Sequence, residues 1–346
     1  MPPMIFTPIK IGQLVLKNRI AMSPMCMYSG NGDGKVTDFH FVHYGARATG
    51  QVGLIILEVC SVHPDGMGNP KELGIWEDGQ IEGLKRIVEF VHAEGSKIAI
   101  QIGHAGRKSE LPAEPLAPSA IAYDNQSRTP GEMSRKDIEN MIDCFKAAAA
   151  RAKKAGFDAI ELHAAHGYLI NQFLSPLTNQ RQDAYGGSIQ NRVRFLVEII
   201  ETIKEIWNQS IFVRISADEF HEKGNSLEEI LYIVKAIEDA GVDLVTCSAG
   251  GVVPNQVNVY PGYEVPYAEY VKPKTNILVG TVGLITEAVH AEEILRNKRA
   301  DIILLGRELL RNPFWLYQAS EKIGYAIEAP FQYKRGWDFD IGKVLR

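Results

Sequence analysis

Two histidines and a tyrosine stand close together in the chain, at His163, His166 and Tyr168. Imidazoles can donate hydrogen bonds to a carbonyl oxygen, and a phenol can supply a proton, so this group suits acid–base chemistry on a carbonyl compound. Two histidines three residues apart could also bind zinc, but a zinc site needs further protein ligands and none is evident. Metal binding is therefore the weaker interpretation.

A second group of residues has the chemistry of a phosphate site. Gly283 and Gly306 each end an apolar run late in the chain, and Arg307 follows the second glycine directly. Backbone N–H groups at such glycines can approach phosphate oxygens, and an arginine adds a bidentate cation. The alternative is that both glycines serve only to form turns.

A charged residue and a cysteine complete the set of reactive candidates. Arg214 interrupts an apolar run, and a buried charge is costly unless it is paired. We expect it to pair with Glu161 of the preceding run, or to face a ligand that is negatively charged in one state. A lone cysteine such as Cys26 is commonly a small buried hydrophobe, but its place near a predicted strand end beside Tyr28 favours contact with a cofactor.

The elements that position these residues repeat along the chain. Short apolar runs alternate with helical patterns, which predicts parallel strands joined by crossover helices. The runs cover residues 20–25, 52–58, 97–104, 158–163, 211–217, 243–248, 276–283 and 301–307. Helix starts are predicted at Ser134 and at the capping box of Ser226 and Glu229, and helix stops at Gly156 and Gly241.

Eight strands within 346 residues favour one (β/α)8 barrel spanning residues 1–346 as a single domain. A doubly wound sheet is the alternative, weakened because no Gly-x-Gly-x-x-Gly follows an early strand. Residues 9–20 predict a hairpin around Gly12 that closes the barrel floor. Residues 105–131 form a long excursion after the third strand, expected to lie over the catalytic mouth, because the carboxyl ends of barrel strands carry the chemistry.

Composition narrows the class of protein. There are 37 Lys+Arg and 42 Asp+Glu residues, a net charge of −5, which argues against a nucleic-acid binder. No apolar run is long enough to span a membrane, and the first residues lack the pattern of a secretory signal. The four cysteines are widely separated without a CxxC pair, so we expect a reducing cytoplasm and neither disulfides nor an iron–sulfur cluster.

Longer motifs carry a family resemblance. Residues 163–179, followed by Arg181, Asp183 and the Tyr-Gly-Gly-Ser of 185–188, resemble the signature of the Old Yellow Enzyme family. The Ser-Pro-Met-Cys-Met-Tyr of 23–28 and the Gln-Tyr-Lys-Arg-Gly-Trp of 332–337 are similar to its bacterial NADPH dehydrogenase branch with an active-site cysteine. The resemblance implies a (β/α)8 barrel that binds FMN non-covalently, is reduced by NADPH, and reduces an activated alkene: an α,β-unsaturated carbonyl compound, a maleimide or a nitro compound.

The same resemblance implies a set of cofactor contacts. The residues expected to contact FMN are Ser23, Pro24, Met25, Cys26, Cys60, Gln101, Arg214, Gly283, Gly306 and Arg307. The last three would hold the phosphate, Gln101 and Arg214 would face the pyrimidine edge, and Cys26 would lie near the reactive face. Cys60 departs from the family pattern, because relatives often carry alanine there.

The resemblance also implies the catalytic and substrate residues. The residues expected to act in catalysis are His163, His166, Tyr168 and Cys26. The histidines would bind the substrate carbonyl and Tyr168 would protonate the α-carbon. Tyr28 and Lys108 would line the substrate pocket. Arg335, in a tail of about residues 325–346, would reach into the site of a neighbouring subunit of a homodimer or homotetramer.

The residues alone leave a second enzyme class open. A flavin-free phosphate-binding barrel, such as an isomerase or an aldolase, would use Lys108 as a Schiff-base lysine. Such an enzyme would share the phosphate site, but it has no use for Cys26, Gln101 and Arg214 together. A visible absorption spectrum distinguishes the two classes.

Overall fold

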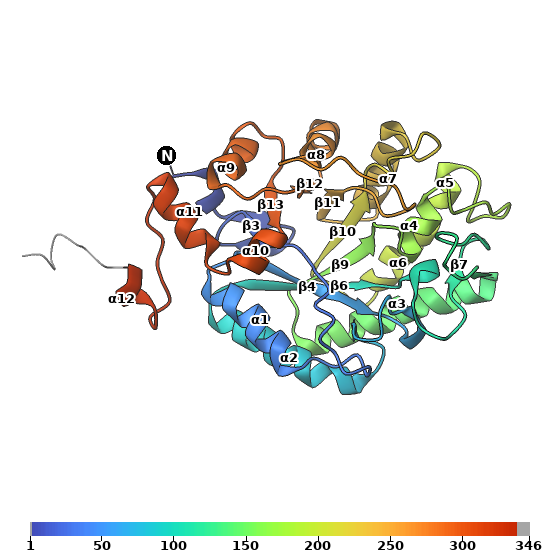
Figure 1. Cartoon of the computed structure of the whole chain (residues 1–346), viewed down its shortest axis with the longest axis horizontal. Coiled ribbons are helices and arrows are strands. Elements are labelled where there is room, and N and C mark those ends of the chain that lie inside the picture. The colour runs from blue at the N-terminus through green and yellow to red at the C-terminus, as the bar shows by residue number, and fades with distance from the viewer. Residues whose placement is uncertain (1, 338–346) are drawn as a thin grey trace, which may run out of the picture.

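Eight parallel strands close into a barrel in the computed structural model, which describes residues 2–337 (Figure 1). The barrel strands are β3 (Ile20–Met22), β4 (Leu54–Ser61), β6 (Lys97–Gly103), β9 (Ala159–Ala164), β10 (Ser210–Ser216), β11 (Leu244–Ser248), β12 (Leu278–Thr281) and β13 (Ile302–Leu305). β3 pairs with both β13 and β4, which closes the ring, and β5 (Leu73–Gly74) adds to the end of β4. Each of the eight predicted runs overlaps one barrel strand, so the predicted fold is confirmed.

Helices surround the barrel and connect its strands (Figure 1). They are α1 (Asp38–Thr49), α2 (Ile81–Ala93), α3 (Arg135–Ala155), α4 (Leu169–Leu174), α5 (Ile189–Arg192), α6 (Arg194–Lys204), α7 (Leu227–Asp239), α8 (Val265–Val271), α9 (Ala288–Arg296), α10 (Arg307–Arg311), α11 (Trp315–Ile323) and α12 (Lys334–Trp337). Within residues 2–337, none of these helices combines the length and the apolarity that crossing a bilayer requires.

The predicted helix signals are confirmed at the ends of α3 and α7. The Ser134 hydroxyl accepts a hydrogen bond from the third residue of α3, and Ser226 forms a capping box with Glu229 at the start of α7. Gly156 and Gly241 follow the two helices with φ angles of 88° and 87°, a left-handed conformation that glycine adopts without the clash of a Cβ atom. These caps set where the chain turns back toward β9 and β11.

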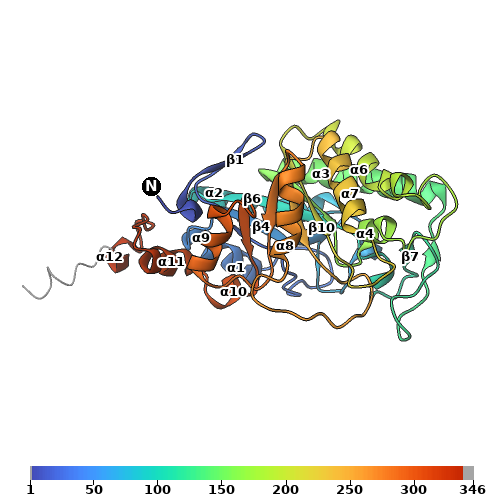
Figure 2. The ribbon, with the colours of Figure 1, turned by 90° about the horizontal axis from the view of Figure 1, so that it is seen from above.

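A hairpin closes one end of the barrel, as predicted. It consists of β1 (Ile9–Ile11) and β2 (Leu14–Leu16), which are antiparallel and joined through Gly12 at a φ of 57°. The apolar side chains of the hairpin pack against inward-facing residues of the barrel, among them Leu54, Phe212 and Leu304. Figure 2 shows this hairpin on the opposite side of the barrel from α10, which follows β13. The carboxyl ends of the strands therefore form the only end left for chemistry within the described chain.

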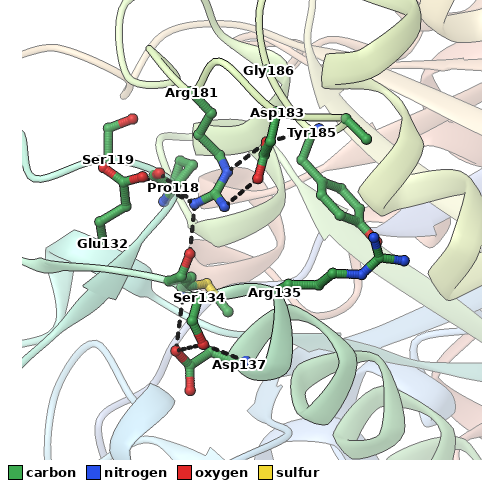
Figure 3. Close-up of polar contacts among 12 residues, drawn as sticks. Pro118, Ser119, Glu132, Ser134, Arg135, Asp137, Arg181, Asp183, Tyr185 and Gly186 are labelled. Carbon is green, nitrogen blue, oxygen red and sulfur yellow. Dashed lines mark hydrogen bonds and ion pairs between the residues drawn. The ribbon is translucent and has the colours of Figure 1, made fainter.

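The long excursion after β6 is tied to the segment that follows β9. It contains the short helix η4 (Gly106–Lys108) and strand β7 (Leu116–Ala117), which pairs with β8 (Gly131–Glu132). In Figure 3 the buried guanidinium of Arg181 lies between these segments. It donates to the Pro118 and Met133 carbonyls at 3.0 and 2.6 Å, and to both carboxylate oxygens of Asp183. Lys108, in the first part of the excursion, lines a cavity at the carboxyl ends of the strands.

Candidate functional site

Two adjoining cavities lie at the carboxyl ends of the strands. The arginine cavity, about 320 Å³, is defined by Arg214 together with the late glycines and Arg307. The histidine cavity, about 250 Å³, is defined by His163 and its neighbours. Because Pro24 and His166 line both, the two cavities adjoin each other.

The cavities gather most of the residues expected from the sequence. The arginine cavity is lined by Ser23, Pro24, Met25, His166, Arg214, Gly283, Gly306 and Arg307. The histidine cavity is lined by Pro24, Cys26, Tyr28, Gln101, Lys108, His163, His166 and Tyr168. These residues come from six of the eight barrel strands or from the connections that follow them, so the closure of the barrel is what brings them together.

Arg214 has hydrogen-bonding capacity left over. Its Nη1 donates to the Ser23 hydroxyl at 2.6 Å, and its Nη2 donates to the Ser248 hydroxyl at 3.4 Å. Its Nε is buried and has no hydrogen-bond partner among the described residues. A buried donor without a partner costs about 1–3 kcal/mol, so this guanidinium is arranged to receive an acceptor from a ligand.

The expected ion pair between Arg214 and Glu161 is not formed. Glu161 instead accepts a hydrogen bond from Nε2 of Gln101 at 2.8 Å, and Arg214 uses hydroxyl partners. The reason is the strand register, in which Glu161 lies opposite Phe212, two residues below Arg214. Complete burial raises the pKa of Glu161 to about 7, while the positive charge of Arg214 acts in the opposite direction.

His163 presents an N–H group to the histidine cavity. Its Nδ1 accepts a hydrogen bond from the backbone N–H of Ala165 at 3.3 Å, so the proton of the neutral ring is on Nε2. Burial, and secondarily the charge of Arg214, lowers the pKa of His163 to about 3. The ring is therefore a neutral hydrogen-bond donor at physiological pH.

His166 is held in a strained conformation by a chain of polar contacts. Its φ angle is 56°, which is uncommon for a residue with a side chain. Its Nε2 lies 2.8 Å from the Ser248 hydroxyl, which lies 3.1 Å from Oε1 of Glu264. Because the carboxylate accepts the hydroxyl proton, the Ser248 oxygen accepts from the imidazole. His166 is thus also an Nε2–H donor, and burial holds its pKa well below the usual range.

Tyr168 and Lys108 stand beside the histidines. The Tyr168 ring stacks on His163, with ring centroids 4.6 Å apart. Nζ of Lys108 donates to the His166 carbonyl at 3.0 Å and to the Gly251 carbonyl at 3.3 Å, so it ties the excursion to two other loops. Burial raises the pKa of the Tyr168 phenol far above its ordinary value, so the phenol stays protonated.

Gly283 and Gly306 both lie in the wall of the arginine cavity. Gly283 has a φ angle of 109°, and a Cβ atom there would come within 2.9 Å of the Glu264 backbone nitrogen. At Gly306 a Cβ atom would reach toward Met25 and Ser23, at 3.6 and 3.9 Å, and so would fill space inside the cavity. Both glycines therefore line a cavity in addition to forming turns.

Cys60 and Arg335 lie outside both cavities. The pairing of β4 with β6 shifts between Leu57 and Cys60, so Val59 faces the histidine cavity and the Cys60 side chain is buried in the surrounding core. Arg335 is exposed on α12, at the margin of the molecule beyond α11 (Figure 1). The residues after 337, which include the end of the expected tail, lie outside the described part of the chain.

The same irregularity of β4 reveals a residue that the sequence analysis missed. The Glu58 carboxylate turns outward, where it accepts the Met27 backbone N–H at 2.8 Å and the Tyr44 hydroxyl at 2.9 Å. It thereby fixes the loop between Cys26 and Tyr28. Glu58 is the single charged residue within the apolar pattern of residues 52–60, and this could have indicated a specific role for it. Ser248 and Glu264 were also missed, because only the fold brings them to His166.

Sequence comparison places these residues among known proteins. A model of the NADH:flavin oxidoreductase / NADH oxidase family matches residues 4–325. The NADPH dehydrogenase of Geobacillus thermodenitrificans (strain NG80-2) is 54% identical over 340 residues, which covers 98% of this chain and 100% of that protein. The similarity therefore extends across the barrel and all of the cavity residues.

Solved structures of reductases superimpose on this chain. Morphinone reductase superimposes with a TM-score of 0.81 at 30% identity, covering 94% of this chain and 91% of that one. A 2-naphthoyl-CoA reductase in complex with 2-naphthoyl-CoA superimposes with a TM-score of 0.88 at 27% identity. That match covers 94% of this chain but 53% of the reductase, so this chain spans about half the length of that protein.

Proposed function

Because the chain belongs to the NADH:flavin oxidoreductase / NADH oxidase family and is an FMN-dependent NADPH oxidoreductase of the Old Yellow Enzyme type, we propose that it reduces activated alkenes. The substrate class is an alkene conjugated to a carbonyl or nitro group. The observation that carries the proposal is the placement of two neutral N–H donors and a protonated phenol in one cavity, directly beside the cavity of Arg214.

The described residues fit FMN. Gly283 and Gly306 in the wall of the arginine cavity, together with Arg307, suit the phosphate, since backbone N–H groups and a guanidinium are its usual partners. Arg214, with its buried unpartnered Nε, suits an edge that becomes electron-rich on reduction. FMN, when bound, supplies the two-electron hydride chemistry.

The side chains of the histidine cavity would prepare the alkene. Nε2–H groups of His163 and His166 would donate hydrogen bonds to the carbonyl oxygen, which makes the β-carbon more electrophilic. Tyr168 would then give its phenolic proton to the α-carbon. For His166 this requires that the ring exchange its contact with Ser248 for one with the substrate.

The flavin-free alternative loses its support. The family is one of FMN enzymes, and Lys108, the Schiff-base candidate, directs its Nζ to two backbone carbonyls. We propose that Lys108 fixes the shape of the substrate pocket. The four cysteines of the chain are all free thiols, which fits the cytoplasmic location that we propose.

The purified protein is expected to be yellow and to consume NADPH when 2-cyclohexen-1-one is added without oxygen. The visible spectrum measures the bound flavin. The amount of saturated ketone formed per NADPH oxidised measures the reduction of the alkene. A yellow protein that oxidised NADPH but left enones, maleimides and nitroalkenes unchanged would contradict the alkene-reductase assignment.

We also propose that Arg335 acts in the site of a neighbouring subunit. Arg335→Ala is expected to raise the KM for the enone by about 10-fold, the effect of losing one charge-assisted hydrogen bond. Mixing Arg335→Ala with Tyr168→Phe subunits should then restore activity, because the second variant supplies the arginine to the intact site of the first.

Lys322→Ala, a change of an exposed residue on α11, is the matched control and should leave the KM unchanged. The oligomeric state is measured by size-exclusion chromatography with light scattering. A fully active protein that is strictly monomeric would contradict the role in trans.

A further inference from the structure

A buried glutamate forms part of the wall of the arginine cavity. Glu264 directly precedes α8, lines this cavity and is 3% exposed. Arg214, the cation whose charge acts on it, donates its hydrogen bonds instead to the hydroxyls of Ser23 and Ser248. An ionised carboxylate in this position is costly to bury and repels any anion that shares the cavity.

The two carboxyl oxygens of Glu264 have different surroundings. Oε1 accepts the backbone N–H of Ala249 at 2.9 Å and the Ser248 hydroxyl at 3.1 Å. Oε2 lies beside Gly283, because a Cβ atom built on that glycine would be 3.1 Å from it. Since Gly283 lines the same cavity, Oε2 is the oxygen on the side where we place the phosphate.

The hydrogen bond from Ala249 determines which oxygen of Glu264 can carry a proton. A backbone N–H can only donate, so Oε1 remains an acceptor whether the carboxyl group is ionised or neutral. Because Oε1 already accepts two hydrogen bonds, the proton of the neutral acid is on Oε2, on the side of Gly283. The neutral acid is then a hydrogen-bond donor toward an anion, whereas the ionised form can only accept.

The other titratable groups around Glu264 keep one charge state near neutral pH. The titratable and charged neighbours are Arg214 of β10, Cys247 of β11, Tyr263, Tyr267 of α8, His166 and Arg307 of α10. Burial raises the pKa of Cys247 and of Tyr263 to about 12, and it also raises the pKa of Tyr267. Burial holds the pKa of His166 well below its usual range.

Glu264 is therefore the group of this wall that is suited to gain a proton. Glu308, the other acidic residue that lines the cavity, is paired with Arg311 of the same helix. Burial raises the pKa of Glu264 above its ordinary value, while the positive charge of Arg214 acts in the opposite direction. The negative charge of a ligand phosphate would raise the pKa of Glu264 further.

We propose that Glu264 takes up a proton from the solvent when the phosphate of FMN enters the arginine cavity, and that its Oε2–H then donates a hydrogen bond to this anion. Flavin binding is thereby coupled to the uptake of one proton. The flavin is held most tightly where Glu264 is already neutral, and the affinity falls as the pH rises and the empty site loses its proton. The inference rests on the proposed function only in placing the phosphate beside Gly283.

The test is the pH dependence of FMN release from the FMN-loaded protein. The protein is diluted at several pH values, and the fluorescence of the released flavin gives the dissociation constant. This constant is expected to rise at least about 5-fold between about pH 7 and about pH 8.5, since one coupled proton changes it by up to about 10-fold per pH unit. The range lies above the second pKa of a phosphate ester, about 6, so the phosphate itself stays doubly ionised.

Glu264→Gln places a permanent N–H donor where the neutral acid has its O–H. Its dissociation constant for FMN should change by less than about 2-fold over the same range, because no proton is coupled to binding. Glu219→Gln is the matched control. Glu219 is also 2% exposed, and burial raises its pKa to about 7, but it lines neither cavity. This control should keep the pH dependence of the original protein.

Riboflavin, which lacks the phosphate, provides a comparison that needs no variant. Its dissociation constant from the original protein should change by less than about 2-fold over this range. Infrared difference spectra at about pH 8 should also show the C=O band of a neutral carboxyl group in the FMN-loaded original protein. This band should be missing from FMN-loaded Glu264→Gln.

Two results would overturn the proposal. One is an FMN affinity that depends on pH as strongly in Glu264→Gln as in the original protein. The other is a riboflavin affinity with the same pH dependence as that of FMN, which decides the question even where Glu264→Gln does not fold. Enone turnover is not part of these measurements, so a failure of the proposed alkene reduction leaves their outcome unaffected.

Discussion

Arg214→Ala is expected to bind FMN about 30-fold to about 4,000-fold more weakly than the original protein. Truncating one partner of a buried charge interaction costs about 2–5 kcal/mol. The guanidinium is 6% exposed, is oriented by the hydroxyls of Ser23 and Ser248, and has a free Nε that suits the flavin edge. The flavin content of the purified variant and the quenching of flavin fluorescence on titration measure the effect.

Arg135→Ala is the matched control, because its side chain is 77% exposed at the start of α3. It should retain full flavin content. The flavin content of Arg214→Lys should lie between those of Arg214→Ala and Arg135→Ala, since lysine keeps the charge but cannot reproduce the planar guanidinium. An Arg214→Ala protein that is folded and carries the original amount of flavin would refute the assigned role.

Replacing both His163 and His166 by alanine is expected to lower enone turnover by at least about 100-fold. Removing a single donor from an oxyanion-type site costs about 100-fold to about 1,000-fold in kcat. Reduction of the flavin by NADPH is expected to persist in the same variant, so the two half-reactions should separate in stopped-flow measurements. His221→Ala, a change in an exposed loop, is the control and should affect neither half-reaction.

The protonation state of these histidines predicts the pH dependence of substrate binding. Burial and the charge of Arg214 lower the pKa of His163 to about 3, and they lower that of His166 well below its ordinary value. Because the neutral donor form is present above those values, enone affinity should be flat from about pH 5 to about pH 8 and should fall only in stronger acid. Unaltered enone turnover in the double variant, or a change in affinity near pH 6.5, would contradict the assignment.

Much of the barrel could be predicted because its signals are local. Each parallel strand is buried on both faces and so is read as a short apolar run. The helices α3 and α7 begin at their own capping residues, Ser134 and Ser226. The cavity residues could be predicted for a related reason. Strand ends share one edge of the barrel, so His166, Arg214 and Gly306 were expected to meet once the strands were assigned.

What the sequence could not predict depends on register and on backbone irregularity. The register shift between Leu57 and Cys60 changes which side of β4 the side chains face. Val59 therefore lines the cavity, and the Glu58 carboxylate accepts a hydrogen bond from Tyr44 of α1. The expected pair of Arg214 with Glu161 was wrong because adjacent strands are offset along the barrel axis. Ser248 on β11 reaches His166 across the intervening strand β10, and Glu264 contacts Ser248, an arrangement that no local pattern encodes.

The hairpin at the barrel floor has a kinetic consequence. With β1 and β2 packed against the inward-facing side chains, the two cavities open at the opposite end. Under the proposed function, the electron donor and the alkene would then share this one entrance. A large excess of either reactant should slow the overall rate by hindering the access of its counterpart.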